Sequence, residues 1–151
     1  MLYIKTKIQP SEIHGIGVFA DEFIPKGKII WKFAPGFDIK FTREQVLGFP
    51  ELLQIYIYKH SWKGTKSKLY CFSSDNGKYF NHSNGPNTLS KYQDNEEEVI
   101  TTAVRDIRVG EELTDNYSSF EADEDGDNVL EEIRKKYNLI DEADPRVKNI
   151  L

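Results

Sequence analysis

The most informative stretch of the sequence is Asn81-His82-Ser83-Asn84-Gly85-Pro86-Asn87, in the middle of the chain. Two other stretches flank it: Gly15-Ile16-Gly17-Val18-Phe19-Ala20 near the start, and Gly110-Glu111-Glu112-Leu113-Thr114-Asp115-Asn116-Tyr117 late in the chain. Taken singly, each can be ordinary turn chemistry, because Gly, Asn and Pro are the residues that interrupt helices and strands. Their order along the chain is therefore more informative than any one of them.

The residues around these motifs predict short strands with a few helices. The β-rich runs are residues 18–20, 29–33, 70–72 and 98–104, and residues 25–28 and 73–78 are predicted turns. Thr42 and Gln45 have capping-box spacing, which predicts a short helix to about Leu47, and a second helix is predicted after Pro50. We expect a mainly β fold with short helices, of the α+β class.

The C-terminal segment has a different character. Residues 121–127 are almost wholly acidic, and apolar residues then recur at helical spacing: Val129, Leu130, Ile133, Tyr137 and Ile140. This pattern predicts an amphipathic C-terminal helix. Because 151 residues suit one core, we expect residues 1–120 to form one domain and residues 121–151 to belong to the same globular unit.

Composition limits the classes of partner. The net charge of −5 and the pI near 5.3 argue against direct binding to nucleic acid, which needs a basic face, and favour a basic protein or peptide. Cys71 is the only cysteine, which fits a reducing compartment. We see no signal peptide and no membrane-length apolar run. A cytoplasmic setting is expected, or a nuclear one in a eukaryote.

Most familiar chemical motifs are missing. His14, His60, His82 and Cys71 do not fall at zinc-ligand spacings, so we expect no metal. Neither the Gly-x-Ser-x-Gly pattern of hydrolases nor the third glycine of a dinucleotide-binding loop is found.

An imperfect calcium-loop pattern is also present. It places Glu121, Asp123, Asp125, Gly126 and Glu132 at loop positions 1, 3, 5, 6 and 12. Position 1 is usually Asp and position 8 apolar, so an acidic connector leading into the helix is the favoured interpretation. A calcium-responsive protein remains a third hypothesis.

Taken in order, the three motifs resemble those of SET-domain protein-lysine methyltransferases, over about residues 8–117. Residues 14–20 resemble the first glycine motif of that family, residues 75–87 its asparagine-histidine-serine motif, and residues 103–117 its last strand with a catalytic tyrosine. The resemblance is to a small, single-domain member without cysteine-rich flanking segments.

The resemblance implies a SET-type fold of several small β-sheets, in which the last motif makes a knot-like core beside Asn81. It implies that S-adenosyl-L-methionine and a peptide enter from opposite faces. The cofactor would be held by the backbone of His14, Gly15, Ile16 and Gly17, by Asn81, by the His82 backbone and by Tyr117. Tyr117 would also be the catalytic residue, with its hydroxyl at the transferring methyl group.

Elementary chemistry states what such a site must do. A lysine ammonium ordinarily has a pKa of about 10.4 and no lone pair, so the site must favour the neutral amine. Aromatic walls can do so by desolvation, and this chain is 13% aromatic. Alignment of the reacting atoms then supplies much of the rate, so no general base has to be invoked.

The sequence departs from the family pattern near the expected channel. Asn84 replaces a common cysteine, and no cysteine cluster follows Tyr117, so another segment must close the channel. Phe120 and the helix bearing Leu130, Ile133 and Tyr137 are the candidates. Asp115-Asn116 stands where a tyrosine and an aspartate are usual.

Two functions remain open. The first is lysine methylation of a basic substrate, such as a histone-like tail or a ribosomal protein, steered by the acidic surface. The alternative is a catalytically silent SET-like module that binds protein tails.

Overall fold

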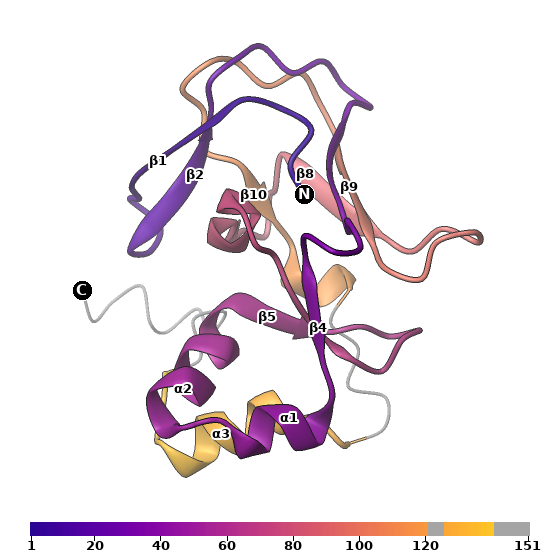
Figure 1. Cartoon of the computed structure of the whole chain (residues 1–151). Coiled ribbons are helices and arrows are strands. Elements are labelled where there is room, and N and C mark those ends of the chain that lie inside the picture. Colours follow the sequence, from indigo (N-terminus) through magenta and orange to yellow (C-terminus); the bar gives the residue numbers. More distant parts are fainter. Residues whose placement is uncertain (121–125, 141–151) are drawn as a thin grey trace.

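The computed structural model describes residues 1–120 and 126–140, and in this part the strands form four small sheets (Figure 1). One antiparallel pair joins β1 (Thr6–Pro10) to β2 (Ile16–Ala20). A second sheet has the order β3 (Ile29–Lys32), β9 (Ile100–Ala103), β8 (Thr88–Lys91). A third has the order β4 (Ile39–Phe41), β6 (Tyr70–Phe72), β5 (Ser61–Lys63). The fourth pairs β7 (Asn81–His82) with β10 (Thr114–Asp115) in parallel.

The first and last motifs share one hydrophobic core. Its buried residues are Val18, Ala20, Ile24, Ile30, Ala103, Ile107 and Leu113. Leu113 donates its backbone N–H to the carbonyl of Val18 over 2.8 Å, so the last motif is joined directly to β2. Burial of these aliphatic side chains brings segments from both ends of the domain together.

The helices form a second core against the β4–β6–β5 sheet, in the lower half of Figure 1. They are α1 (Arg43–Gly48), α2 (Glu51–His60) and α3 (Val129–Lys136). The buried residues of this core are Val46, Ile57, Tyr70, Val129, Leu130 and Ile133. The capping box predicted at Thr42 is present, with both of its hydrogen bonds.

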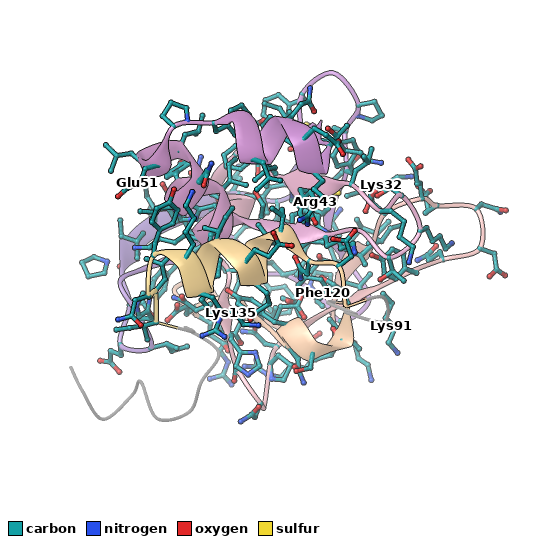
Figure 2. All side chains as sticks on the ribbon, turned by 90° about the horizontal axis from the view of Figure 1, so that it is seen from below. Lys32, Arg43, Glu51, Lys91, Phe120 and Lys135 are labelled. Carbon is teal, nitrogen blue, oxygen red and sulfur yellow. The ribbon has the colours of Figure 1, made fainter. Side chains whose placement is uncertain are left out.

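The start of α3 is held by polar contacts. Asn128 accepts the N–H of Leu130 as the N-cap, and Tyr70 Oη accepts the N–H of Val129 over 2.9 Å. Arg43, the first residue of α1 and labelled in Figure 2, pairs with Asp127 and Glu132 over 2.8 and 2.7 Å, so its side chain connects α1 to the start of α3.

The predicted calcium loop lies partly outside the described residues, at its positions 121, 123 and 125. Its last position, Glu132, is engaged by Arg43. Within residues 1–120 and 126–140, no group of three or more His, Cys, Asp or Glu side chains is placed to hold a metal ion.

The last motif is packed tightly against the middle motif. In the parallel β7–β10 pair, Thr114 lies opposite Asn81 and Asp115 lies opposite His82. The N–H of Thr114 also donates to Asn87 Oδ1 over 2.9 Å. This close packing of the two motifs is the arrangement that the resemblance implied.

Several predicted elements differ in extent from the structure. The β-rich run at 98–104 becomes strand only over Ile100–Ala103, because β3 ends at Lys32 and β8 ends at Lys91, both opposite Ile100. The predicted turn at 73–78 includes part of a 3₁₀ helix, Asn76–Tyr79, which Asp75 caps. Among the described residues, no helix is long and apolar enough to cross a membrane.

Candidate active site

Asn81 joins the glycine motif to the last motif. Asn81 is buried, with only 7% of its surface exposed. Its Nδ2 donates to the carbonyls of His14 and Ile16 over 3.1 and 3.3 Å. The same nitrogen lies 2.7 Å from Glu112 Oε1. One amide therefore sets the position of the 14–16 backbone relative to Glu112.

Glu112 is the residue that sequence reasoning missed here. Both of its carboxylate oxygens accept from Ser11 Oγ, over 2.8 and 2.9 Å. A Cβ added to Gly17 would lie 2.2 Å from Glu112 Oε1, so the space beside Gly17 is filled by this carboxylate. Glu112 belongs to the last motif of the sequence. Its position beside Gly17 depends on the contact between that motif and β2, so no pattern of neighbouring residues predicts it.

His82 positions the backbone of Tyr117. The N–H of Tyr117 donates to His82 Nδ1 over 3.2 Å, so in the neutral ring Nδ1 carries the lone pair and Nε2 carries the hydrogen. Nε2 lies 3.3 Å from Asn84 Oδ1, which accepts it. Asn84, one of the departures from the family pattern, thereby orients the His82 ring.

The Tyr117 side chain is held at the middle motif. Its hydroxyl donates to the backbone carbonyl of Phe80, which can only accept. Its ring packs between His82 and Phe120, with centroid distances of 5.3 and 6.1 Å. Because the one hydroxyl hydrogen of Tyr117 is used in this bond, the Tyr117 oxygen can only accept a hydrogen bond from any further polar group.

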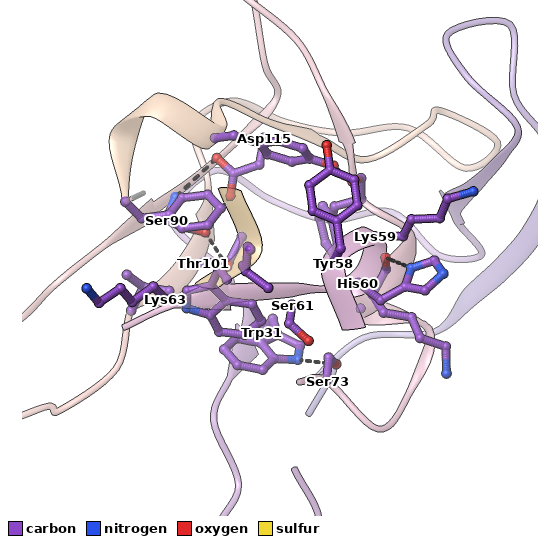
Figure 3. Close-up of a pocket in the computed structure, with 18 of the residues that line it drawn as sticks. Trp31, Tyr58, Lys59, His60, Ser61, Lys63, Ser73, Ser90, Thr101 and Asp115 are labelled. Carbon is purple, nitrogen blue, oxygen red and sulfur yellow. Dashed lines mark hydrogen bonds between the residues drawn. The ribbon is translucent and has the colours of Figure 1, made fainter. Parts of the chain in front are cut away.

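Next to Tyr117 lies a cavity of about 440 Å³ (Figure 3). Its aromatic walls are Trp31, Tyr58, Trp62, Phe80, Tyr117 and Phe120. Trp62 contacts Trp31 and Phe120 at centroid distances of 5.3 and 6.3 Å. Of the residues that the sequence suggested for closing the channel, Phe120 and Leu130 line the cavity, whereas Ile133 and Tyr137 pack in the second core.

Asp115 places a carboxylate in the cavity wall, and it is only 3% exposed. Its Oδ1 accepts the N–H groups of Asn116 and Ser90 over 2.7 and 3.3 Å, and its Oδ2 accepts from Ser90 Oγ. Ser90 in turn contacts Thr101 Oγ1 over 2.7 Å, a chain visible in Figure 3. Burial raises the pKa of Asp115, and the hydrogen bonds from Ser90 partly offset that rise.

The site residues expected from the sequence thus fall into two groups. His14, Gly15, Ile16, Gly17 and Asn81 gather around Glu112, with His82 one strand position further on. None of these residues lines the cavity, whereas Tyr117 does. Tyr117 contacts both groups, because its N–H bonds to His82 of the first group, here called the glycine-loop group, and its side chain lines the cavity.

Comparison with known proteins identifies the family of the chain. The family model described as the SET domain matches residues 15–118, which is more than half of the chain. The chain therefore belongs to the SET-domain family. The sequence matches none of the curated proteins with which it was compared.

Two solved structures illustrate the shared fold. One is a Plasmodium falciparum protein described provisionally as a histone methyltransferase, with 24% identity, a TM-score of 0.55, and coverage of 77% of this chain and 95% of that one. The other is a humanised mutant of the Chaetomium thermophilum Polycomb Repressive Complex 2 bound to an inhibitor. It has 22% identity, a TM-score of 0.56, and coverage of 79% of this chain and 16% of that one.

Proposed function

We propose that this SET-domain protein transfers a methyl group from S-adenosyl-L-methionine to the side-chain amine of a lysine in a protein substrate. The observation that carries the proposal is the position of Tyr117, which lines the aromatic cavity, donates its hydroxyl to the carbonyl of Phe80 and bonds through its N–H to His82. Membership of the SET-domain family supports it, as does the likeness to a protein described as a histone methyltransferase.

The groups around Asn81 fit the proposed cofactor. S-adenosylmethionine carries an ammonium and a sulfonium, which require acceptors or negative charge, and when bound it supplies the activated methyl group. Glu112 offers a carboxylate beside Gly17. Asn81 Oδ1 accepts no hydrogen bond within the described part of the chain, since the contacts of Asn81 are made through Nδ2. We assign the ammonium to these oxygens, and the remaining cofactor contacts to the backbone at 14–17 and at His82.

The cavity and Tyr117 would prepare the substrate amine. An aromatic enclosure disfavours the ammonium form, so the proton leaves to solvent as the side chain enters. Because the Tyr117 hydroxyl donates to Phe80, its oxygen can accept an amine N–H and thereby aim the nitrogen lone pair. Most of the catalytic effect proposed for this chain is therefore orientation and exclusion of water.

The first test is incubation with tritiated S-adenosylmethionine and a panel of histones and ribosomal proteins, followed by mass spectrometry of labelled products. Label on lysine would support the proposal and show how many methyl groups are added. Binding of cofactor and protein without any label would favour the catalytically silent tail-binding module.

Tyr117→Phe tests the tyrosine directly. Loss of the hydroxyl is expected to lower kcat by about 10- to 1000-fold, because the amine is no longer oriented, and to leave cofactor affinity nearly unchanged. Tyr56→Phe is the matched control, since Tyr56 is 39% exposed and does not line the cavity. Equal turnover in the two variants would refute a catalytic role for Tyr117.

A further inference from the structure

The charges around the cavity are opposite in sign to the charge of the whole chain. The chain carries a net charge of −5, yet three lysines line the cavity: Lys59, Lys63 and Lys78. They come from three separate segments: Lys59 from the last turn of α2, Lys63 from β5, and Lys78 from the 3₁₀ helix. This lysine rim is produced by the fold and not by a basic run in the sequence.

The acidic residues that line the cavity do not cancel the lysine rim. Glu131 is engaged by Arg134 over 2.9 Å, so this pair contributes little net charge. Asp115 lies in the interior wall and is held by Ser90 and Asn116. Asp115 is therefore an interior negative group, whereas Lys59 and Lys78 are the more exposed positive groups that line the cavity.

Two of the rim lysines are available to a partner. Lys59 is exposed, and Lys78 is half-buried with its Nζ 5.5 Å from the Phe72 ring centroid. Neither forms an ion pair among the described residues. Lys63, by contrast, donates to the Asp127 carbonyl. In Figure 3 the side chains of Lys59 and Lys63 extend away from the centre of the cavity, on opposite sides.

We propose that the substrate segment carries acidic side chains beside the lysine that enters the cavity. This inference rests on the proposed function, because it takes the cavity to be the lysine site. An amine fits the aromatic interior with its single carboxylate, and acidic neighbours fit the lysine rim. A densely basic tail would instead bring like charges against Lys59 and Lys78 at short range, where the net charge of the distant surface is screened by salt.

The test uses three fluorescent peptides that share a central lysine and differ only in the residues on both sides: glutamate, serine or lysine. Anisotropy at low salt is expected to show about 3- to 10-fold tighter binding of the glutamate peptide than of the serine peptide, and weaker binding of the lysine peptide. Added salt should reduce these differences. Equal binding of the three peptides, or tightest binding of the lysine peptide, overturns the inference.

Charge reversal identifies the residues responsible. Lys59→Glu with Lys78→Glu is expected to reverse the order of the glutamate and lysine peptides. Lys26→Glu with Lys28→Glu changes the net charge equally at residues that do not line the cavity, and should leave the order unchanged. If the variant with both Lys59→Glu and Lys78→Glu does not fold, the single variant Lys59→Glu replaces it, because Lys59 is exposed. The single variant is expected to lose part of the preference for the glutamate peptide.

Two further results separate this inference from the proposed function. Methylation of the lysine peptide in preference to the glutamate peptide overturns the inference and leaves the proposed function standing. Charge-dependent binding of the glutamate peptide without methylation of any peptide counts against the proposed function alone. Displacement of the glutamate peptide by equimolar single-stranded RNA would assign the lysine rim to phosphate and would also overturn the inference.

Discussion

At the residue scale, Glu112 connects the parts of the site that the sequence presents separately. Its carboxylate lies beside Gly17, accepts from Ser11 and contacts Asn81. The family resemblance implied that the backbone at Gly17 faces the cofactor. The structure shows that the group approaching Gly17 is a side chain of this same chain.

Gly17→Ala is expected to destabilise the protein by about 1–3 kcal/mol, because the new Cβ would overlap Glu112 and displace it from Asn81. Urea denaturation measures the free energy of unfolding. Gly48→Ala is the control, since a Cβ there meets no atom within 4 Å, and it should be neutral or slightly stabilising. Equal stability of the two variants would show that Glu112 moves away without cost.

Asp115 should make stability depend on pH. Burial raises its pKa in the folded state, so the folded protein keeps this proton to higher pH than the unfolded chain, whose pKa is about 3.9. The Asp115 contribution to the free energy of unfolding therefore falls as the pH rises from the unfolded pKa through the folded pKa.

Asp115→Asn removes that titration and can keep the hydrogen bonds from Ser90 and Asn116 to Oδ1. Urea denaturation over a pH series is expected to show the wild type losing stability relative to the variant as the pH rises. A difference between the two proteins that stays constant with pH would contradict this prediction.

At the element scale, α3 forms part of both the second core and the cavity. Ile133 is buried with Val46 and Ile57, and Leu130 and Glu131 of the same helix line the cavity. The helix is short, so its stability must come largely from this packing and from the Asn128 cap.

Ile133→Ala should therefore cost about 2–5 kcal/mol, because it leaves a cavity in the second core at a residue only 1% exposed. Leu52→Ala on α2 is a matched aliphatic control, 80% exposed, and should change stability by less than about 0.5 kcal/mol. Similar unfolding midpoints for the two variants would mean that α3 contributes little to the folded state.

At the scale of the whole molecule, the last motif connects the first core to the cavity, since Leu113 is buried in that core and Tyr117 lines the cavity. The first core holds Val18 and Leu113, the second holds α3, and Tyr117 lies beside the cavity that both Trp31 and Leu130 line. A ligand that bridges the glycine-loop group and Tyr117 should stabilise the folded molecule as a whole.

S-adenosylmethionine at about 100 times its Kd is expected to add about 2.7 kcal/mol to the free energy of unfolding, and so to raise Tm by about 5–10 °C. Thermal denaturation with and without the cofactor measures this shift. Asn81→Ala should lose most of the shift at a given concentration. An unchanged Tm for the wild type at high cofactor concentration would argue against the proposed cofactor site.

The sequence alone was sufficient for the features that depend on neighbouring residues. The Thr42 capping box, strands β2 and β6 and the apolar spacing of α3 were all predicted, because capping and periodicity are local. The ordered motifs likewise indicated the SET fold, which the family match confirmed. The short strands β7 and β10 were not predicted, since a strand of two residues exists only through its partner.

Tertiary structure decided the contacts between residues far apart in the chain. The position of Glu112 against Gly17, the bond from Ser90 to Asp115, and the lysines gathered around a cavity in an acidic protein all arise from sheet pairing and core packing. Such contacts depend on which segments bury their apolar side chains together, and neither composition nor spacing encodes that choice locally. The sequence by itself therefore determined the family and indicated candidate residues for the site, and the fold decided which groups those residues face.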